Sequence, residues 1–159
     1  MTRESILQLL EQVKDPEIPV LSVMKLGIIR DVRVQGQDVE VDMTPTFAGC
    51  PAIERMKADI VETLTAAGAA RVQVQVLYRQ AWSTDEISAE GRRILKDFGL
   101  SPPPLIGADT VEPEDLMQAE CPRCGSQDTR LLSSFGPTAC RAIHHCNSCH
   151  ETFEQMKPL

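Results

Sequence analysis

Two Cys-x2-Cys pairs constrain this chain more than any other feature of its sequence. Cys121 and Cys124 form the first pair, Cys146 and Cys149 form the second, and 21 residues separate the pairs. Each pair places two thiolates on one tight turn, and two such turns can enclose a metal ion in the tetrahedral sulfur geometry of structural zinc sites. Gly125 follows the first pair, where a residue without a Cβ allows the turn to close tightly. The spacing therefore predicts a zinc ribbon with these four cysteines as ligands.

Two disulfides would be the alternative use of four paired cysteines. The chain starts with an amphipathic pattern in place of a signal-peptide core, and no apolar run approaches membrane-spanning length. These features predict a cytoplasmic protein, in a compartment that keeps thiols reduced. A ribbon of about forty residues cannot bury enough surface to fold alone, and structural zinc (Zn2+) would supply the missing stability.

The distribution of charge argues against nucleic acid as a partner. The net charge is −7, and acidic residues outnumber basic ones both in residues 1–109 and in residues 110–159. Neither part offers the basic surface that binding to nucleic acid requires. We expect neither nucleic acid nor a membrane among the partners.

Hydrophobic periodicity predicts an α+β module ahead of the ribbon. Ser83 and Glu86 form a capping box that predicts the start of a third helix, with Trp82 and Phe98 in the core. The predicted helices span 6–13, 53–64 and 87–98, and the predicted strands span 32–34, 39–43 and 72–78. The expected fold class is α+β: a small mixed sheet with packed helices, followed by a C-terminal zinc-ribbon module.

The same patterns divide the chain into domains. Residues 1–100 are expected to form the α+β domain, and residues 119–159 the zinc ribbon. Residues 101–118, with several prolines, are expected to form a stiff linker between them.

Cys50 precedes the second predicted helix and is the one cysteine of the first module. Pro51 suits the first helical turn, so Cys50 is expected at the N-cap, facing free backbone N–H groups. That position favours thiolate, and Gly49 would leave the sulfur approachable. A small buried cysteine fits the local sequence equally well, so a reactive and a structural role both stay open.

Several short motifs, in their order along the chain, resemble a known family. The first three look like the iron–sulfur assembly domain of cytosolic and Suf-type maturation factors: Asp15-Pro16-Glu17-Ile18-Pro19-Val20, Leu26-Gly27-Ile28-Ile29 and Thr44-Pro45-Thr46 leading to Gly49-Cys50-Pro51-Ala52. Further motifs extend the resemblance to the PaaD family of phenylacetyl-CoA epoxidase systems: Ala81-Trp82-Ser83-Thr84-Asp85, Cys121-Pro122-Arg123-Cys124-Gly125-Ser126 and Phe135-Gly136-Pro137-Thr138-Ala139-Cys140-Arg141.

The resemblance implies a non-catalytic accessory role in phenylacetate catabolism, the degradation of an aromatic compound. Such a protein would assist assembly or delivery of iron–sulfur or iron centres to the oxygenase–reductase complex, so its partners would be the epoxidase oxygenase and the iron–sulfur reductase. The resemblance also implies Cys50, Asp15 and Glu17 as candidates for iron or iron–sulfur transfer. The sequence agrees, because it lacks the Glu-x-x-His pairs of a di-iron site and a Gly-x-Gly-x-x-Gly dinucleotide motif.

The number of cysteines limits how a transient cluster could be held. A cluster usually takes about four thiolates, and only Cys50 and Cys140 lie outside the ribbon pairs. Further ligands would have to come from a second copy in a homodimer, from the client protein or from carboxylates. Asp15 next to Pro16 is, however, more often a turn residue than a ligand. We expect Cys140 to be buried.

Two other functions stay open from the sequence. One is a purely structural subunit of the oxygenase complex. The other is a thiol enzyme that uses Cys50 as a nucleophile, which calls for a nearby base. The histidines lie in the predicted ribbon, in a different module from Cys50: His144, His145 and His150.

Overall fold

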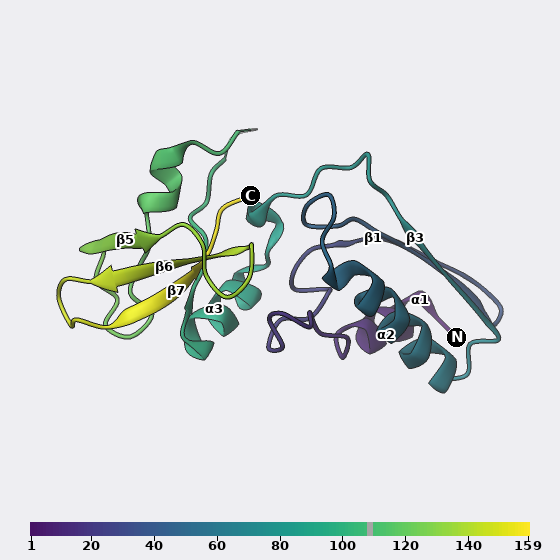
Figure 1. Ribbon diagram of the computed structural model, residues 1–159. Helices are drawn as coiled ribbons and strands as arrows, with labels where there is room; N and C mark the ends of the chain where they lie inside the picture. Colours follow the sequence, from purple (N-terminus) through teal and green to yellow (C-terminus); the bar gives the residue numbers. More distant parts are fainter. Residues whose placement is uncertain (108–109) are drawn as a thin grey trace. The chain divides into compact units, whose positions relative to one another are not determined.

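The computed structural model describes residues 1–107 and 110–159 (Figure 1). The chain forms two compact units, Met1–Trp82 and Ser83–Leu159. The fold class predicted from the sequence is confirmed, since a mixed sheet with helices is followed by a four-stranded sheet that carries the cysteine cluster.

The first unit is a three-stranded sheet with two helices. Its elements are α1 (Arg3–Leu10), β1 (Ile29–Gln35), β2 (Asp38–Met43), α2 (Ala52–Ala66) and β3 (Arg71–Val76). The strand order is β1-β2-β3: a tight hairpin makes β1 antiparallel to β2, and the crossover through α2 makes β3 parallel to β2. The loop from β2 into α2 therefore starts at one edge of this sheet, and it carries Cys50.

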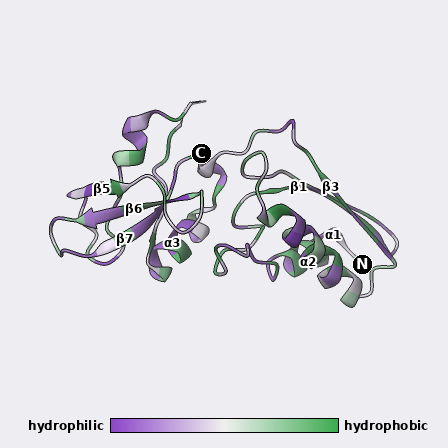
Figure 2. Ribbon diagram, viewed as in Figure 1, coloured by the Kyte–Doolittle hydropathy of each residue, from purple (hydrophilic) through white to green (hydrophobic). Residues whose placement is uncertain are grey.

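The core of this unit lies between the sheet and the helices. In β2, Val39, Val41 and Met43 are buried, and they alternate with more exposed residues. In Figure 2, α2 shows both hydrophobic and hydrophilic residues along its length, as an amphipathic helix does. The buried residues of α2 recur at helical spacing, and each large one contributes about 1.5–3 kcal/mol on burial: Ile53, Met56, Ile60 and Leu64.

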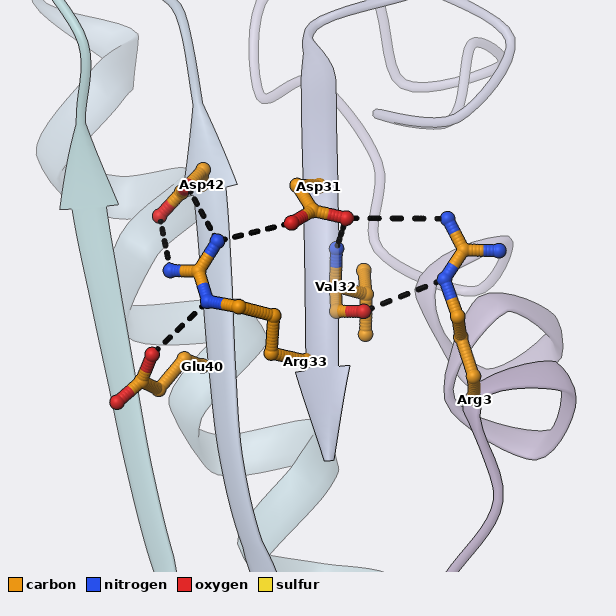
Figure 3. A network of polar contacts seen from close by, with 6 residues as sticks. All are labelled: Arg3, Asp31, Val32, Arg33, Glu40 and Asp42. Carbon is orange, nitrogen blue, oxygen red and sulfur yellow. Dashed lines mark hydrogen bonds and ion pairs between the residues drawn. The ribbon is translucent and has the colours of Figure 1, made fainter. Parts of the chain in front are cut away.

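Charged residues on β1 and β2 form a network centred on Arg33 (Figure 3). The Arg33 guanidinium donates to both carboxylate oxygens of Asp42, at 2.7 and 2.9 Å, and to Asp31 at 2.9 Å and Glu40 at 3.0 Å. The hydrogen bonds to Asp42, and then those to Glu40 and Asp31, raise the pKa of Arg33. These side chains are partly exposed, so the network marks a sheet face on which no apolar core is packed.

The second unit contains the ribbon and the helix that precedes it. Its elements are η1 (Thr84–Glu86), α3 (Ala89–Phe98), β4 (Leu100–Ser101), η2 (Pro113–Met117), β5 (Thr129–Ser133), β6 (Arg141–Cys146) and β7 (Thr152–Met156). The strand order is β4-β7-β6-β5, with β5, β6 and β7 antiparallel and β4 parallel to β7.

Two predictions around α3 are wrong. The Ser83–Glu86 capping box closes the short 3-10 helix η1, because Ile87 then turns to an extended conformation, and Ser88 caps α3 by accepting from Gly91 N–H at 2.9 Å. Phe98 is 51% exposed, while Leu95 is the fully buried residue of that helix. Trp82, in contrast, is buried as predicted, and its Nε1 donates to the Leu26 carbonyl at 3.0 Å.

The division into units differs from the predicted domain boundaries. Hydrogen bonds attach the proline-rich segment to η1 and α3: Asp85 accepts from Ile106 N–H at 2.9 Å and Gly107 N–H at 2.7 Å, and Arg92 donates to the Pro103 carbonyl. The prolines indicated a stiff segment, but they carried no information about the side chains that anchor it. Residues 83–107 therefore group with the ribbon.

Candidate metal centre and the cysteine before α2

The same two backbone hydrogen bonds close both cysteine turns of the ribbon. In the first turn Gly125 N–H donates to the Cys121 carbonyl at 2.9 Å, and Cys121 N–H donates to the Ser126 carbonyl at 2.9 Å. In the second turn the equivalent bonds join His150 to Cys146 at 3.0 Å and Cys146 to Glu151 at 2.8 Å. The ribbon therefore presents two matching turns, each with a pair of thiols.

The four thiols fit the geometry of a tetrahedral zinc site. All four Sγ atoms lie within 4.8 Å of one another, and the Cys121–Cys149 and Cys124–Cys146 sulfur pairs are 3.7 and 3.6 Å apart. Zinc–sulfur bonds of about 2.3 Å in a tetrahedron require sulfurs about 3.8 Å apart. In the part of the chain that the structure describes, no other group brings three or more Cys, His, Asp or Glu ligand atoms this close.

Backbone hydrogen bonds and the shared cage shift the ionisation of these thiols. Cys149 N–H donates to the Cys146 sulfur at 3.5 Å, and this bond is the main reason that the pKa of Cys146 is lowered to about 6. A backbone hydrogen bond from Glu151 lowers the pKa of Cys149, but burial and hydrogen bonds to the other three thiols outweigh it and raise that pKa. The cluster can thus ionise only in part, and a bound metal would displace the remaining protons.

Packing and side-chain contacts hold the two turns together. Cys121 and Cys146 are fully buried in a small cluster with Ala119 and Phe153. On the outside, Arg123 of the first turn forms an ion pair with Glu151 of the second at 2.5 Å. The metal centre is therefore the core of the ribbon.

The three histidines stay out of the sulfur cage, as expected. His144 is fully buried, its Nε2 lies 2.9 Å from Gln155 Oε1, and its ring stacks on Phe153 with centroids 5.7 Å apart. His145 and His150 have ring centroids 6.0 Å apart, a juxtaposition that the sequence reasoning missed. The signal was available, because both flank the second cysteine pair in a predicted hairpin.

Cys50 lies directly before Pro51, which takes the N-cap position of α2, one residue later than predicted. Pro51 already has helical backbone angles (φ −69°, ψ −21°), so the shift lies within the usual spread of helix-end assignments. Cys50 is only 6% exposed, although Ala48, Gly49 and Pro51 around it are exposed. Of the two possibilities that the sequence left open, burial is the one found.

Asp15 has the turn role that the sequence offered as its alternative. The residue is buried, and its Oδ1 accepts from Glu17 N–H at 2.7 Å and from Ile18 N–H at 3.0 Å. Glu17 is half-buried. Within the described residues, Asp15, Glu17 and Cys50 do not form a group of three ligand atoms within 4.8 Å of one another. The predicted transfer set is therefore not preassembled in a single chain.

Cys140 is buried, at 7% exposed, as predicted. Its sulfur lies 3.1 Å from Thr138 Oγ1, and its carbonyl accepts from Lys157 N–H at 2.8 Å. No helix in residues 1–107 or 110–159 is long and apolar enough to cross a membrane.

Comparisons with known proteins match both units. Residues 3–76 match the iron–sulfur cluster assembly protein family, and residues 107–157 match the PaaD zinc β-ribbon domain. The chain is 37% identical over 92 residues to an Fe-S protein maturation auxiliary factor of Porphyromonas gingivalis, which covers 56% of this chain and 86% of the relative. A crystal structure of a domain of unknown function from Bacillus anthracis superimposes with a TM-score of 0.54 at 25% identity, covering 58% of this chain and 89% of that one.

One relative matches along almost the whole chain. It is the PaaD subunit of the putative 1,2-phenylacetyl-CoA epoxidase of Escherichia coli K12, which is 41% identical over 149 residues, 94% of this chain and 88% of the relative. With an iron–sulfur assembly domain followed by the PaaD zinc ribbon, the chain belongs to the PaaD family.

Proposed function

We propose that this protein helps to assemble or deliver iron–sulfur or iron centres to the oxygenase–reductase complex of a phenylacetyl-CoA epoxidase system. The observation that carries the proposal is the combination of two similarities. The first unit is similar to an Fe-S protein maturation auxiliary factor, and the whole chain is similar to the PaaD subunit of an epoxidase. A maturation domain joined to an epoxidase-specific ribbon fits an accessory protein with a dedicated client.

The two units would divide the work. Four cysteines close the tetrahedral cage of the ribbon, so its zinc has no open position for substrate and serves the fold. Cys50 is the one cysteine of the first unit, and it precedes the positive end of the α2 dipole. We assign Cys50 as the thiolate that holds iron cargo during transfer, because thiolate is the protein ligand of iron–sulfur clusters.

Burial of Cys50 sets a condition for this role. The residue is 6% exposed, so iron and client groups reach its sulfur only after local movement of the loop before α2. The exposed residues Ala48 and Gly49 form the outer part of that loop. The remaining ligands would come from the client or from a second copy of the chain, with Glu17 and Asp15 as candidate carboxylates after rearrangement.

A structural subunit of the oxygenase complex is the second candidate function. Burial of Cys50 and the engagement of Asp15 in its own turn favour this candidate, since both residues then serve the fold. A thiol enzyme is the weaker alternative, because residues 1–82 contain no histidine that could act as the base. The cytoplasmic location stays a prediction.

Genetic complementation tests the proposal. A phenylacetate-degrading bacterium that lacks its own PaaD would receive the wild-type chain, Cys50→Ser or Cys140→Ser at matched expression. We expect wild type and Cys140→Ser to restore growth on phenylacetate and the iron content of the purified epoxidase, and Cys50→Ser to restore neither. Full restoration by Cys50→Ser would favour the structural subunit. Cys140→Ser is the matched control because Cys140 is buried to the same degree, 7% against 6% exposed.

A further inference from the structure

Two histidines of the ribbon lie next to each other outside the sulfur cage. His145 belongs to β6, and its ring centroid is 6.0 Å from that of His150, with an angle of 37° between the rings. His150 is exposed and His145 is half-buried. The remaining histidine, His144, is fully buried against Gln155 and Phe153, so this pair holds both accessible imidazoles of the chain.

The separation of the two rings suits one shared metal ion. A metal–nitrogen bond of about 2.0–2.1 Å places the ion about 3.2 Å from the centroid of each imidazole. Two imidazoles on one ion then have centroids about 4.5 to 6.4 Å apart as the nitrogen–metal–nitrogen angle opens from about 90° to about 180°. The observed 6.0 Å lies inside this range. Rotation about the side-chain bonds is enough to aim the two nitrogens at a common point.

The backbone at His150 gives an independent reason to look for a role of its side chain. His150 is the one non-glycine residue in the described parts of the chain with a positive φ, 63°. The equivalent place in the first cysteine turn is occupied by Gly125, with φ 75°. Glycine adopts this conformation without strain, whereas a residue with a Cβ does not. Retained strain of this kind is typical of functional positions.

We propose that His145 and His150 form a second metal site, which binds one divalent ion of the zinc, nickel or copper class. Imidazole is a good ligand for these ions. Two protein ligands leave the other coordination positions to water, so the ion is held more weakly than zinc in the four-cysteine cage and exchanges readily. The site is separate from the iron-transfer role of Cys50 and does not depend on it.

The charges around the pair predict how its affinity can be tuned. Arg130 lies opposite His145 in the β5–β6 register, and residues that face each other in this way project from the same side of a sheet. The positive charge of Arg130 opposes a dication at His145. The acidic neighbour Glu151 is already paired with Arg123. Removing the charge of Arg130 should therefore strengthen metal binding.

Calorimetric titration of the full-length, zinc-loaded protein with Ni2+ tests the site. We expect one Ni2+ per chain without release of zinc. His145→Gln and His150→Asn should each weaken Ni2+ binding by about tenfold or more, and Arg130→Gln should strengthen it by about twofold or more. Asn at position 150 accepts a positive φ, so the turn is preserved. In NMR spectra, paramagnetic Ni2+ should broaden the ring signals of His145 and His150 and leave those of His144 sharp.

The same experiment can overturn the proposal. Zinc-loaded wild type that takes up no Ni2+, or that binds it unchanged in both histidine variants, would exclude the site. Weaker binding in Arg130→Gln would contradict the placement of the ion beside His145. Zinc content of each variant is measured first, and if His150→Asn loses zinc, His145→Gln decides the outcome alone.

Discussion

Asp15 Oδ1 accepts a hydrogen bond from the backbone N–H of Ile18 at 3.0 Å, and both residues are buried. This bond, with the one from Glu17 N–H, closes the turn that follows α1. An aspartate next to a proline is typical of such turns. The carboxylate that the family resemblance nominated for iron therefore has a structural function in the resting protein.

Substitution of Asp15 separates its structural role from a role in metal binding. Asp15→Ala should destabilise the first unit by about 1–3 kcal/mol, because two backbone donors lose their acceptor in a buried turn. Asp15→Asn should cost less, since an amide oxygen can accept the same bonds. Urea denaturation followed by the fluorescence of Trp82, the single tryptophan, measures both. Equal losses in the two variants would contradict the turn role.

The contrast between Gly125 and His150 predicts opposite effects of two substitutions. His150→Gly should stabilise the zinc-loaded second unit by about 1 kcal/mol, because it relieves a positive φ. Gly125→Ala should destabilise it by about 1 kcal/mol or more for the same reason, although a Cβ there meets nothing closer than 3.8 Å. Guanidinium unfolding monitored by far-ultraviolet circular dichroism at a fixed zinc concentration gives both values. A His150→Gly protein less stable than wild type would disprove the strain.

Removing the metal should unfold the second unit and spare the first. The cage is the core of the ribbon, and β4 pairs with β7, so loss of the ribbon should spread to the α3–β4 region. Hydrogen exchange after treatment with a strong chelator should show loss of amide protection in β6 and β7, with α2 still protected. Cys146→Ser should reproduce this pattern. Native protection of β6 in metal-free protein would contradict the account.

The stability of the first unit should fall with acid in a way that depends on Glu11. Burial raises the pKa of Glu11, but hydrogen bonds from Lys25 at 2.6 Å and Ser22 at 2.7 Å outweigh it, and the pKa is lowered overall. A carboxyl group with a lowered pKa stabilises the fold above its unfolded pKa of about 4.3, and this contribution is lost as the pH falls through the folded pKa.

Glu11→Gln should therefore lose less stability than wild type between neutral pH and about pH 3. The urea midpoint of Trp82 fluorescence at each pH measures this difference. The control is Glu54→Gln, since Glu54 makes only an exposed ion pair with Lys57. Identical pH profiles for wild type and Glu11→Gln would show that these bonds add no acid-sensitive stability.

The regular elements and the metal cage could be predicted from the sequence because each rests on local spacing. The valines of β2 alternate with a period of two, and the buried residues of α2 follow the helical period. Two residues between paired cysteines place both thiols on one turn. Such patterns leave their mark within a few neighbouring residues, so a single sequence displays them.

Features that depend on distant residues could not be predicted. Phe98 has the right helical spacing for the core, but Gly99 ends α3 there and Phe98 is left exposed. The proline-rich segment reads as a linker, yet Asp85 and Arg92 bind it to η1 and α3. The burial of Cys50 depends likewise on how the loop before α2 packs, which the neighbouring glycine and proline do not reveal.

Metal analysis of anaerobically purified protein tests the central claim most directly, namely that Cys50 holds iron cargo. Iron, sulfide and zinc would be quantified in wild type, Cys50→Ser and Cys140→Ser after reconstitution with ferrous iron and sulfide. The account predicts one zinc per chain in all three proteins, with iron bound by wild type and Cys140→Ser and absent from Cys50→Ser. Iron retained at the wild-type level by a folded Cys50→Ser protein would contradict it.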